Sequence, residues 1–190
     1  MICQAIELDR RNGGKEMKKT KNLVFIALSA AFIAVCAWIT VPGPVPFTMQ
    51  TMAVVTVTAL LGPWHGFAAV VVYLLLGAVG VPVFSGFRGG VQALVGPTGG
   101  YLVGFMFTAL LTGWIAKRAE KLLPLVLAMA AGIAVCYVFG TAWFGLFFAN
   151  GGLGKILMTC VVPFLIPDAL KIAVAAILVR RIRKSGVLNR

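Results

Sequence analysis

The stretch PFLIPDALKIAVAAILV, residues 163–179, is a long apolar run that contains one aspartate and one lysine. Of the five acidic residues in the chain, only Asp168 lies at membrane depth, because the other four are in polar tails or loops. A charged side chain at the centre of a membrane helix costs about 2.5 to 3.5 kcal/mol on insertion scales. Lys171 follows at i+3, on the same helix face. The two charges predict either an internal ion pair that locks the helices together or the floor of a polar binding site.

The composition excludes a soluble domain. The 190 residues are 61% hydrophobic and only 12% charged, whereas soluble domains carry about 25% charged residues. The net charge of +12 comes from basic residues that flank apolar segments, so we expect contact with membrane lipid and no nucleic-acid partner. One histidine and four cysteines without a CxxC spacing predict no metal site and no cofactor.

Six apolar segments predict an all-α membrane protein with six transmembrane helices. They lie at about residues 22–40, 48–61, 66–80, 99–116 and 122–148, with a last one after residue 155. A tight turn at 62–65 is expected between the second and third. Six crossings place both termini on one side of the membrane.

The distribution of lysine and arginine predicts which side that is. The N-terminal segment, the turn at 117–121 and the C-terminal tail hold nearly all the basic residues. Only Arg88 and Lys155 fall on the opposite face, and Lys171 lies inside the membrane. By the positive-inside rule, both termini are cytoplasmic in a multi-pass protein of the cell membrane.

Residues 1–16 differ from the rest of the chain because they are polar and lack periodicity. A second methionine, Met17, starts a short basic flank that leads directly into the first apolar segment. We therefore expect 1–16 to be an extension from an upstream start, without a function of its own, and 17–190 to be a single membrane domain.

Three loops are expected on the external side. Residues 41–47, VPGPVPF, contain three prolines and cannot continue a helix. Residues 81–100 form the longest interruption, rich in glycine and punctuated by apolar residues, with Arg88 in the middle. So long a loop in a compact protein is usually functional or disordered, and this one can fold over the protein as a lid. The third loop is 149–155.

Two further features are open to two interpretations. Gln50 sits at the start of the second apolar segment, where its amide can reach either a polar ligand or a neighbouring carbonyl. In the first segment, Ala27 and Ala31, and likewise Ala30 and Ala34, are four residues apart. Small residues at this spacing let helices approach closely, so the alanines indicate either packing within the chain or a docking face for a partner helix.

The sequence lacks the residues that catalysis needs. It has no Walker A motif, no paired carboxylates and no Ser/His/Asp set. A site with one buried acid, a few polar groups and many apolar side chains favours binding of a mostly apolar molecule from the external side. We expect a protein that is not an enzyme.

Four motifs in order resemble the BioY family, the biotin-binding S component of energy-coupling factor (ECF) vitamin transporters. They are PVPFTMQT (44 to 51), YLLLGAVGVPVF (73 to 84), GPTGGYLVGF (96 to 105) and PFLIPDALK (163 to 171), and the resemblance spans about residues 20–184. It implies the six-helix S-component fold, capture of biotin from outside, and docking onto a transmembrane T component with two cytoplasmic ATPases. It also implies that Ala27 and Ala31 meet the T component.

Biotin suits the polar residues of this chain. Its ureido ring offers two N–H donors and one carbonyl, so Asp168 as acceptor and Lys171 or Gln50 as donor would complement it. The valerate carboxylate lies further away, where we expect it to meet Arg88, lid amides such as those near Gly89, or Tyr101. Three alternatives are an S component for another vitamin, a stand-alone secondary transporter with Asp168 as an ion relay, and a membrane scaffold in which the pair is structural.

Overall fold

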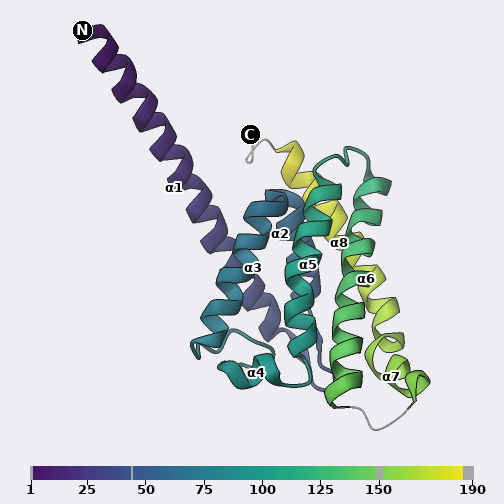
Figure 1. Ribbon diagram of the computed structural model, residues 1–190. Coiled ribbons are helices and arrows are strands. Elements are labelled where there is room, and N and C mark those ends of the chain that lie inside the picture. The colour runs from purple at the N-terminus through teal and green to yellow at the C-terminus, as the bar shows by residue number, and fades with distance from the viewer. Residues whose placement is uncertain (1, 44, 149–151, 186–190) are drawn as a thin grey trace.

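The computed structural model describes residues 2–43, 45–148 and 152–185, without the side chains of residues 2–16, 18 and 153. Within these ranges the regular elements are all helices apart from one short hairpin (Figure 1). The elements in order are α1 (Ile2–Trp38), β1 (Thr40–Val41), β2 (Phe47–Thr48), α2 (Gln50–Leu61), α3 (Pro63–Ala78), α4 (Val91–Val95), α5 (Gly99–Ala116), α6 (Leu122–Phe147), α7 (Leu153–Cys160) and α8 (Val162–Lys184). The predicted all-helical membrane fold is confirmed in this coarse form.

In the part of the chain that the structure describes, four helical segments are long and apolar enough to cross a membrane. These are Lys19–Trp38, Gly99–Ala116, Leu122–Phe147 and Gly154–Lys184. The other two predicted spans correspond to α2 and α3, which are apolar but shorter. The six-helix count therefore stays a prediction, because length and composition support only four crossings directly.

The connection between α2 and α3 is tighter than the sequence predicted. Instead of a turn over 62–65, Gly62 alone separates the two helices, with a φ of 81°. This left-handed region favours glycine. Pro63 then occupies the first helical position, where its missing N–H costs nothing, and His65 lies in the first turn of α3 rather than in a loop.

Helix α2 is the buried centre of the bundle. It is shorter than each of the five helices that pack around it. Nine of its 12 residues are buried, and it packs against α1, α3, α5, α6 and α8. At about 1.5 Å per residue it spans only about 18 Å, against about 30 Å of hydrocarbon. The bundle therefore has free space beyond the N-terminal end of α2.

Helices α5 and α6 pack closely because glycine lies at their contacts. A Cβ on Gly100 would come within 2.2 Å of Trp143, and one on Gly140 within 2.4 Å of the Tyr101 ring. Across the same interface, Thr108 donates its hydroxyl to the carbonyl of Gly132 at 2.8 Å. Small residues and hydroxyl-to-carbonyl bonds replace the hydrophobic driving force that membrane helices lack between themselves.

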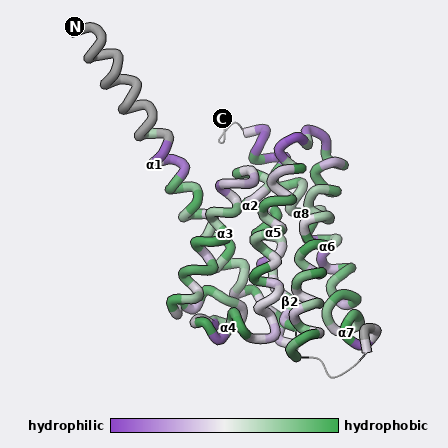
Figure 2. Tube along the Cα trace, in the orientation of Figure 1, coloured by the Kyte–Doolittle hydropathy of each residue, from purple (hydrophilic) through white to green (hydrophobic). Residues whose placement is uncertain are grey.

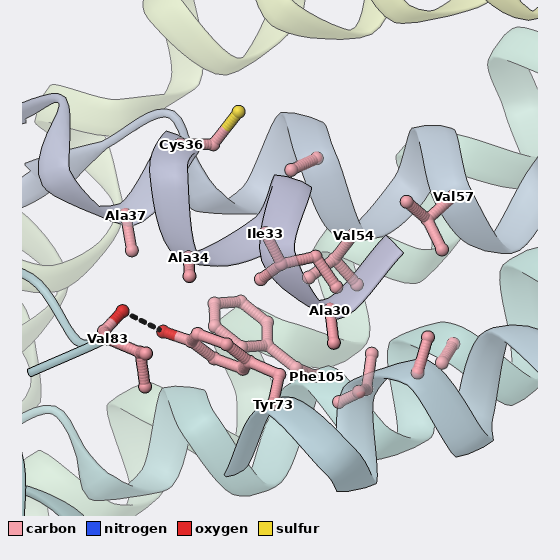
Figure 3. Close-up of a cluster of buried hydrophobic side chains, with 14 of the residues drawn as sticks. Ala30, Ile33, Ala34, Cys36, Ala37, Val54, Val57, Tyr73, Val83 and Phe105 are labelled. Atoms are coloured by element: carbon pink, nitrogen blue, oxygen red, sulfur yellow. Dashed lines mark hydrogen bonds between the residues drawn. The ribbon is translucent and has the colours of Figure 1, made fainter. Parts of the chain in front are cut away.

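Helix α1 presents its two alanine pairs to different surroundings. Ala30 and Ala34 are buried, and in Figure 3 they point, with Ile33, toward the core residues of the neighbouring helices. Ala27 and Ala31 are exposed. The backbone is one continuous helix across the predicted boundary at residue 17 and projects away from the bundle (Figure 1). Whether residues 1–16 have a function stays a prediction.

The last predicted span is broken, as its two prolines suggested. Helix α7 ends at Cys160, Val161 has non-helical dihedrals, and α8 starts at Val162. Pro163 lies in the first turn of α8, and Pro167 lies inside that helix, where it has no N–H to donate. The break lies just before Asp168.

At the opposite end of the bundle, Arg183 holds three backbone segments together. Its guanidinium donates to the carbonyls of Ala59 at 2.7 Å, Ala116 at 2.9 Å and Ala119 at 2.8 Å. The Ala59 carbonyl needs such a donor, because its helical partner would be the N–H that Pro63 lacks. Figure 2 shows hydrophilic segments gathered at this end, beside the C-terminus.

Candidate binding cavity

A cavity with an empty volume of about 670 Å³, counted to its open mouth, lies beyond the N-terminal end of α2. Its walls come from the β1–β2 hairpin, α2, α5, α6, α8 and the lid (residues 81–100). Most lining side chains are apolar or aromatic, among them Phe84, Phe105 and Phe164. The space that the short α2 leaves is therefore lined on several sides by side chains of distant segments and opens at a mouth.

Asp168 and Lys171 both line this cavity and form an ion pair with each other. Lys171 Nζ lies 2.7 Å from Asp168 Oδ1, and the two side chains are only 5% and 4% exposed. Both sit on the first turns of α8 after the break at Val161. The i+3 spacing predicted the shared helix face, and the predicted internal ion pair is present at the cavity wall. That the pair forms the floor of a binding site stays a prediction.

The donors of Lys171 are all used inside the protein. Besides Asp168, its ammonium donates to the carbonyl of Thr48 at 2.6 Å and to the hydroxyl of Thr51 at 3.3 Å. It also lies 3.9 Å from the centre of the Phe47 ring, a cation–π contact. A lysine has three N–H donors, so Lys171 anchors α8 to the hairpin and α2 and has no donor left over.

The carboxylate of Asp168, in contrast, retains an acceptor position. Oδ1 accepts from Lys171 and, at 3.5 Å, from the Thr51 hydroxyl, while Oδ2 accepts from the Tyr137 hydroxyl. An ionised carboxylate has about four acceptor positions, and the described residues fill three. Asp168 can therefore accept one hydrogen bond from a molecule in the cavity.

Tyr137 of α6 is a cavity residue that the sequence did not single out. It lines the cavity and donates its hydroxyl to Asp168. The available signal was a tyrosine in the middle of an apolar span, where a phenolic hydroxyl needs a partner. The sequence does not say which partner, because Asp168 is 31 residues away.

Gln50 also reaches the cavity, but its amide is bound to the protein. Its Nε2 donates to the hydroxyl of Tyr73, which in turn donates to the carbonyl of Val83 at 3.1 Å. Figure 3 shows this last bond from α3 to the lid. The sequence left open whether Gln50 meets a ligand or a neighbouring carbonyl, and in the structure its amide joins α2 to the lid through Tyr73.

Tyr101 of α5 lines the cavity and closes the gap in the broken helix. Its hydroxyl donates to the carbonyl of Cys160 at 3.0 Å. That carbonyl is free because the N–H of Phe164 bonds to Val161 instead. Broken helices at membrane depth are tolerated where such partners replace the lost backbone bonds.

The lid folds onto the bundle as predicted, and it contains a short helix, α4, that the sequence did not indicate. Val83 and Phe84 are buried, whereas Phe87 is 62% exposed. Arg88 is exposed at the cavity wall, with its Nε bonded to the carbonyl of Ser85 at 3.2 Å. Gly89 is not among the described residues that line the cavity, and it lies close to the carbonyls of Gly80 and Val81, just after α3.

The lid is also attached to α1. The indole of Trp38 donates to the carbonyl of Pro82 at 2.8 Å, and its ring stacks on Phe87 with centroids 5.1 Å apart. Phe87 has a φ of 56°, a conformation that is unusual for a bulky residue.

The charges of the cavity wall favour a ligand with one negative charge. Asp168 and Lys171 neutralise each other, and within the described residues Arg88 has no carboxylate partner. No group of metal-binding residues occurs in the part of the chain that the structure describes. The arrangement can bind and enclose a mostly apolar molecule, with one carboxylate acceptor inside and one cation at the mouth.

Fold and cavity together define a polytopic membrane protein with a lidded binding cavity. The sequence model of the BioY family matches residues 10–187, and the chain belongs to this family. The biotin transporter BioY of Thermotoga maritima is 41% identical over 168 residues, covering 88% of this chain and 98% of the relative. The probable biotin transporter BioY of Pyrococcus horikoshii is 37% identical, covering 87% and 98%.

A solved structure shares the fold. The crystal structure of the S-component for biotin from an ECF-type ABC transporter superposes with a TM-score of 0.82 at 29% identity, covering 88% of this chain and 93% of that one. The family resemblance read from the four sequence motifs is confirmed. The chain is a multi-pass membrane protein of a transporter family, not an enzyme.

Proposed function

We propose that this chain is the substrate-capture subunit, or S component, of an ECF transporter and that it binds biotin in the cavity beneath the lid. The observation that carries the proposal is a lidded, mostly apolar cavity whose one buried acid keeps an acceptor position open. The biotin transporters named above and the S-component fold support the ligand and the role.

In the proposed complex, Asp168 accepts an N–H of the ureido ring. Lys171 holds the carboxylate of Asp168 in place, because its own three donors are engaged with the protein. Gln50 lies at the same end of α2 and can turn its amide toward the ureido carbonyl. Arg88 supplies the cation for the valerate carboxylate at the mouth, and Tyr101 forms the wall between them.

The proposed topology has six membrane crossings and cytoplasmic termini. The broken pair α7 and α8 forms one crossing, and the shorter helices α2 and α3 form two more. The basic residues at the C-terminal end of the bundle support a cytoplasmic position for that end. The cavity, the hairpin and the lid then face outward in the plasma membrane, where the ligand arrives.

The proposed docking face for a T component is the exposed side of α1. Ala27 and Ala31 lie there next to Val24, Leu28 and Val35, which are 50% to 62% exposed. Two alanines one helical turn apart leave a shallow groove in which a second helix can approach closely. Docking here would join the subunit to the T component and its two ATPases.

Titration calorimetry of the purified, detergent-solubilised chain with biotin tests the capture function. We expect saturable one-to-one binding that Asp168→Asn weakens severely and Lys171→Ala weakens as well. Glu120→Gln is the matched control, since it neutralises an exposed carboxylate far from the cavity. No heat with biotin in a folded sample would contradict biotin as the ligand, and full affinity in Asp168→Asn would contradict the role of Asp168.

Co-purification tests the docking face separately. Ala27→Trp combined with Ala31→Trp should abolish recovery of the T component and the ATPases while biotin binding persists. Leu127→Trp, on an exposed position of α6, should leave the complex intact. Normal recovery with both tryptophans in place would move the interface elsewhere.

A further inference from the structure

The hydroxyl of Ser85 is buried in the cavity wall without a hydrogen-bond partner. Among the described residues, only Ser85 Oγ and Thr141 Oγ1 are buried side-chain polar atoms without one, and of these two residues only Ser85 lines the cavity. Buried polar groups are nearly always hydrogen-bonded in native proteins, so each exception needs an explanation. A ligand in the cavity that accepts a hydrogen bond from Ser85 would explain this one.

The turn that carries Ser85 is built into the lid. The N–H of Phe84 bonds to the carbonyl of Arg88 at 2.9 Å, and Gly86 and Phe87 both have positive φ. Phe84 itself is 3% exposed, so the start of the turn is fixed in the core. The backbone of Ser85 is therefore held in the cavity wall.

The end of the lid turn is fixed as well. The N–H of Gly90 donates to the carbonyl of Gly77 at the end of α3, at 2.6 Å. A Cβ on Gly89 would come within 2.5 Å of the Val81 carbonyl, so only glycine allows this close approach. Both ends of the turn are thus attached to α3 and its C-terminal extension.

Ser85 and Arg88 form a polar pair on one short turn. Arg88 bonds through Nε to the carbonyl of Ser85 and also lines the cavity. The guanidinium is the cation of the wall that no described carboxylate neutralises. A hydroxyl donor and a cation three residues apart suit an anionic oxygen acceptor, whereas the Asp168 carboxylate on α8 suits an N–H donor.

We propose that Ser85 determines specificity for the carboxylate end of the ligand, donating its hydroxyl to the valerate carboxylate of biotin beside Arg88. This inference rests on the proposed binding of biotin in the cavity. It assigns to Ser85 the discrimination between the free acid and neutral derivatives, because a hydrogen bond to an ionised acceptor is roughly twice as strong as one to a neutral acceptor.

The test compares the affinities of biotin and biotin amide for the full chain and for Ser85→Ala. The wild-type protein should prefer biotin. Ser85→Ala should lose about tenfold in biotin affinity, as expected for one charge-assisted bond. Its affinity for biotin amide should fall less, so that the ratio of the two affinities becomes smaller than in the wild type. Ser85→Thr, which keeps a hydroxyl, should recover most of the preference, and Ser185→Ala, outside the cavity, should behave like wild type.

Thermal unfolding of the ligand-free proteins separates this role from a structural one. Removing an unpaired buried hydroxyl should leave the Tm of Ser85→Ala equal to or above that of the wild type. Unchanged biotin affinity in Ser85→Ala, an equal loss for both ligands, or a fall in Tm without a change in preference would overturn the assignment. Failure of the wild-type chain to bind either ligand would instead contradict the proposed function.

Discussion

At the scale of single residues, the two charged groups of the buried pair differ in their hydrogen bonding. All N–H donors of Lys171 are engaged with the protein, whereas the Asp168 carboxylate has one acceptor position open. Lys171 donates its three hydrogen bonds to Asp168, Thr48 and Thr51, so it fixes the position of the Asp168 carboxylate relative to the hairpin and α2. Asp168 keeps an acceptor position for a ligand. Breaking a buried pair by removing one partner costs about 3 to 5 kcal/mol, so Lys171 variants will lose stability as well as affinity.

Tyr137 gives the sharpest residue-scale prediction. Tyr137→Phe keeps the ring that lines the cavity but removes the donor to Asp168 Oδ2. We expect a roughly tenfold loss of biotin affinity by calorimetry, because the carboxylate loses one of the bonds that orient it.

A double-mutant cycle with Asp168→Asn is the control. If Tyr137 acts through Asp168, its substitution should cost little more once the carboxylate is gone. Additive losses would mean that Tyr137 meets the ligand by itself, and an unchanged affinity in Tyr137→Phe would exclude it from the site.

At the scale of elements, the contact between α1 and the lid links two functional regions. Trp38 lies at the end of α1, the helix that carries the proposed docking face, and binds the lid through Pro82 and Phe87. Trp38→Phe loses the hydrogen bond to Pro82. We expect faster biotin dissociation in a stopped-flow or chase experiment, since the lid is then held less firmly.

Trp64→Phe is the matched control for the lid prediction. Trp64 is 76% exposed on α3 and makes no described contact with the lid. Dissociation from Trp38→Phe at the rate of this control would mean that the contacts of the lid with α3 hold it closed without the Trp38 bond.

The contacts of Arg183 predict a stability effect at the other end of the bundle. Its guanidinium serves carbonyls of α2, α5 and the α5–α6 loop. Arg183→Met should lower the Tm in detergent by several degrees, because buried carbonyls lose their donors. Arg183→Lys should recover only part of the lost Tm. A lysine keeps the charge and N–H donors but cannot reproduce the planar fork of the guanidinium.

Arg181→Met is the comparison for Arg183. Arg181 is exposed on the same turn of α8, so its loss removes a charge without removing the bonds. Equal Tm values for the two methionine variants would show that the bonds of Arg183 contribute nothing measurable.

At the scale of the whole molecule, topology can be tested by labelling with a membrane-impermeant maleimide. In a Cys3→Ser background, Phe87→Cys should react from outside intact cells, whereas Ser185→Cys should react only after permeabilisation. The native Cys36, Cys136 and Cys160 are buried and should stay silent. Reaction of both engineered cysteines from outside would contradict the proposed topology.

The sequence by itself determined the mostly helical membrane class and the family, because these depend on local composition and pattern. Long apolar runs bounded by charge must be membrane helices in any fold, and Pro163 and Pro167 must interrupt one wherever it lies. Asp168 and Lys171 could be paired from an i+3 spacing alone. In the same way, Ala27 and Ala31 could be recognised as a small-residue pair, but not distinguished from Ala30 and Ala34.

Only the tertiary structure decided which side chains meet across helices. Asp168 bonds to Tyr137 and Thr51, and Gln50 bonds to Tyr73, whereas the Ser85 hydroxyl has no partner among the described residues. No spacing in the chain encodes these outcomes. They follow from the shortness of α2, which opens the cavity, and from the angles at which α5, α6 and α8 pack around it. Packing of distant segments is a property of the whole bundle, so partners and unpaired groups appear only once it is assembled.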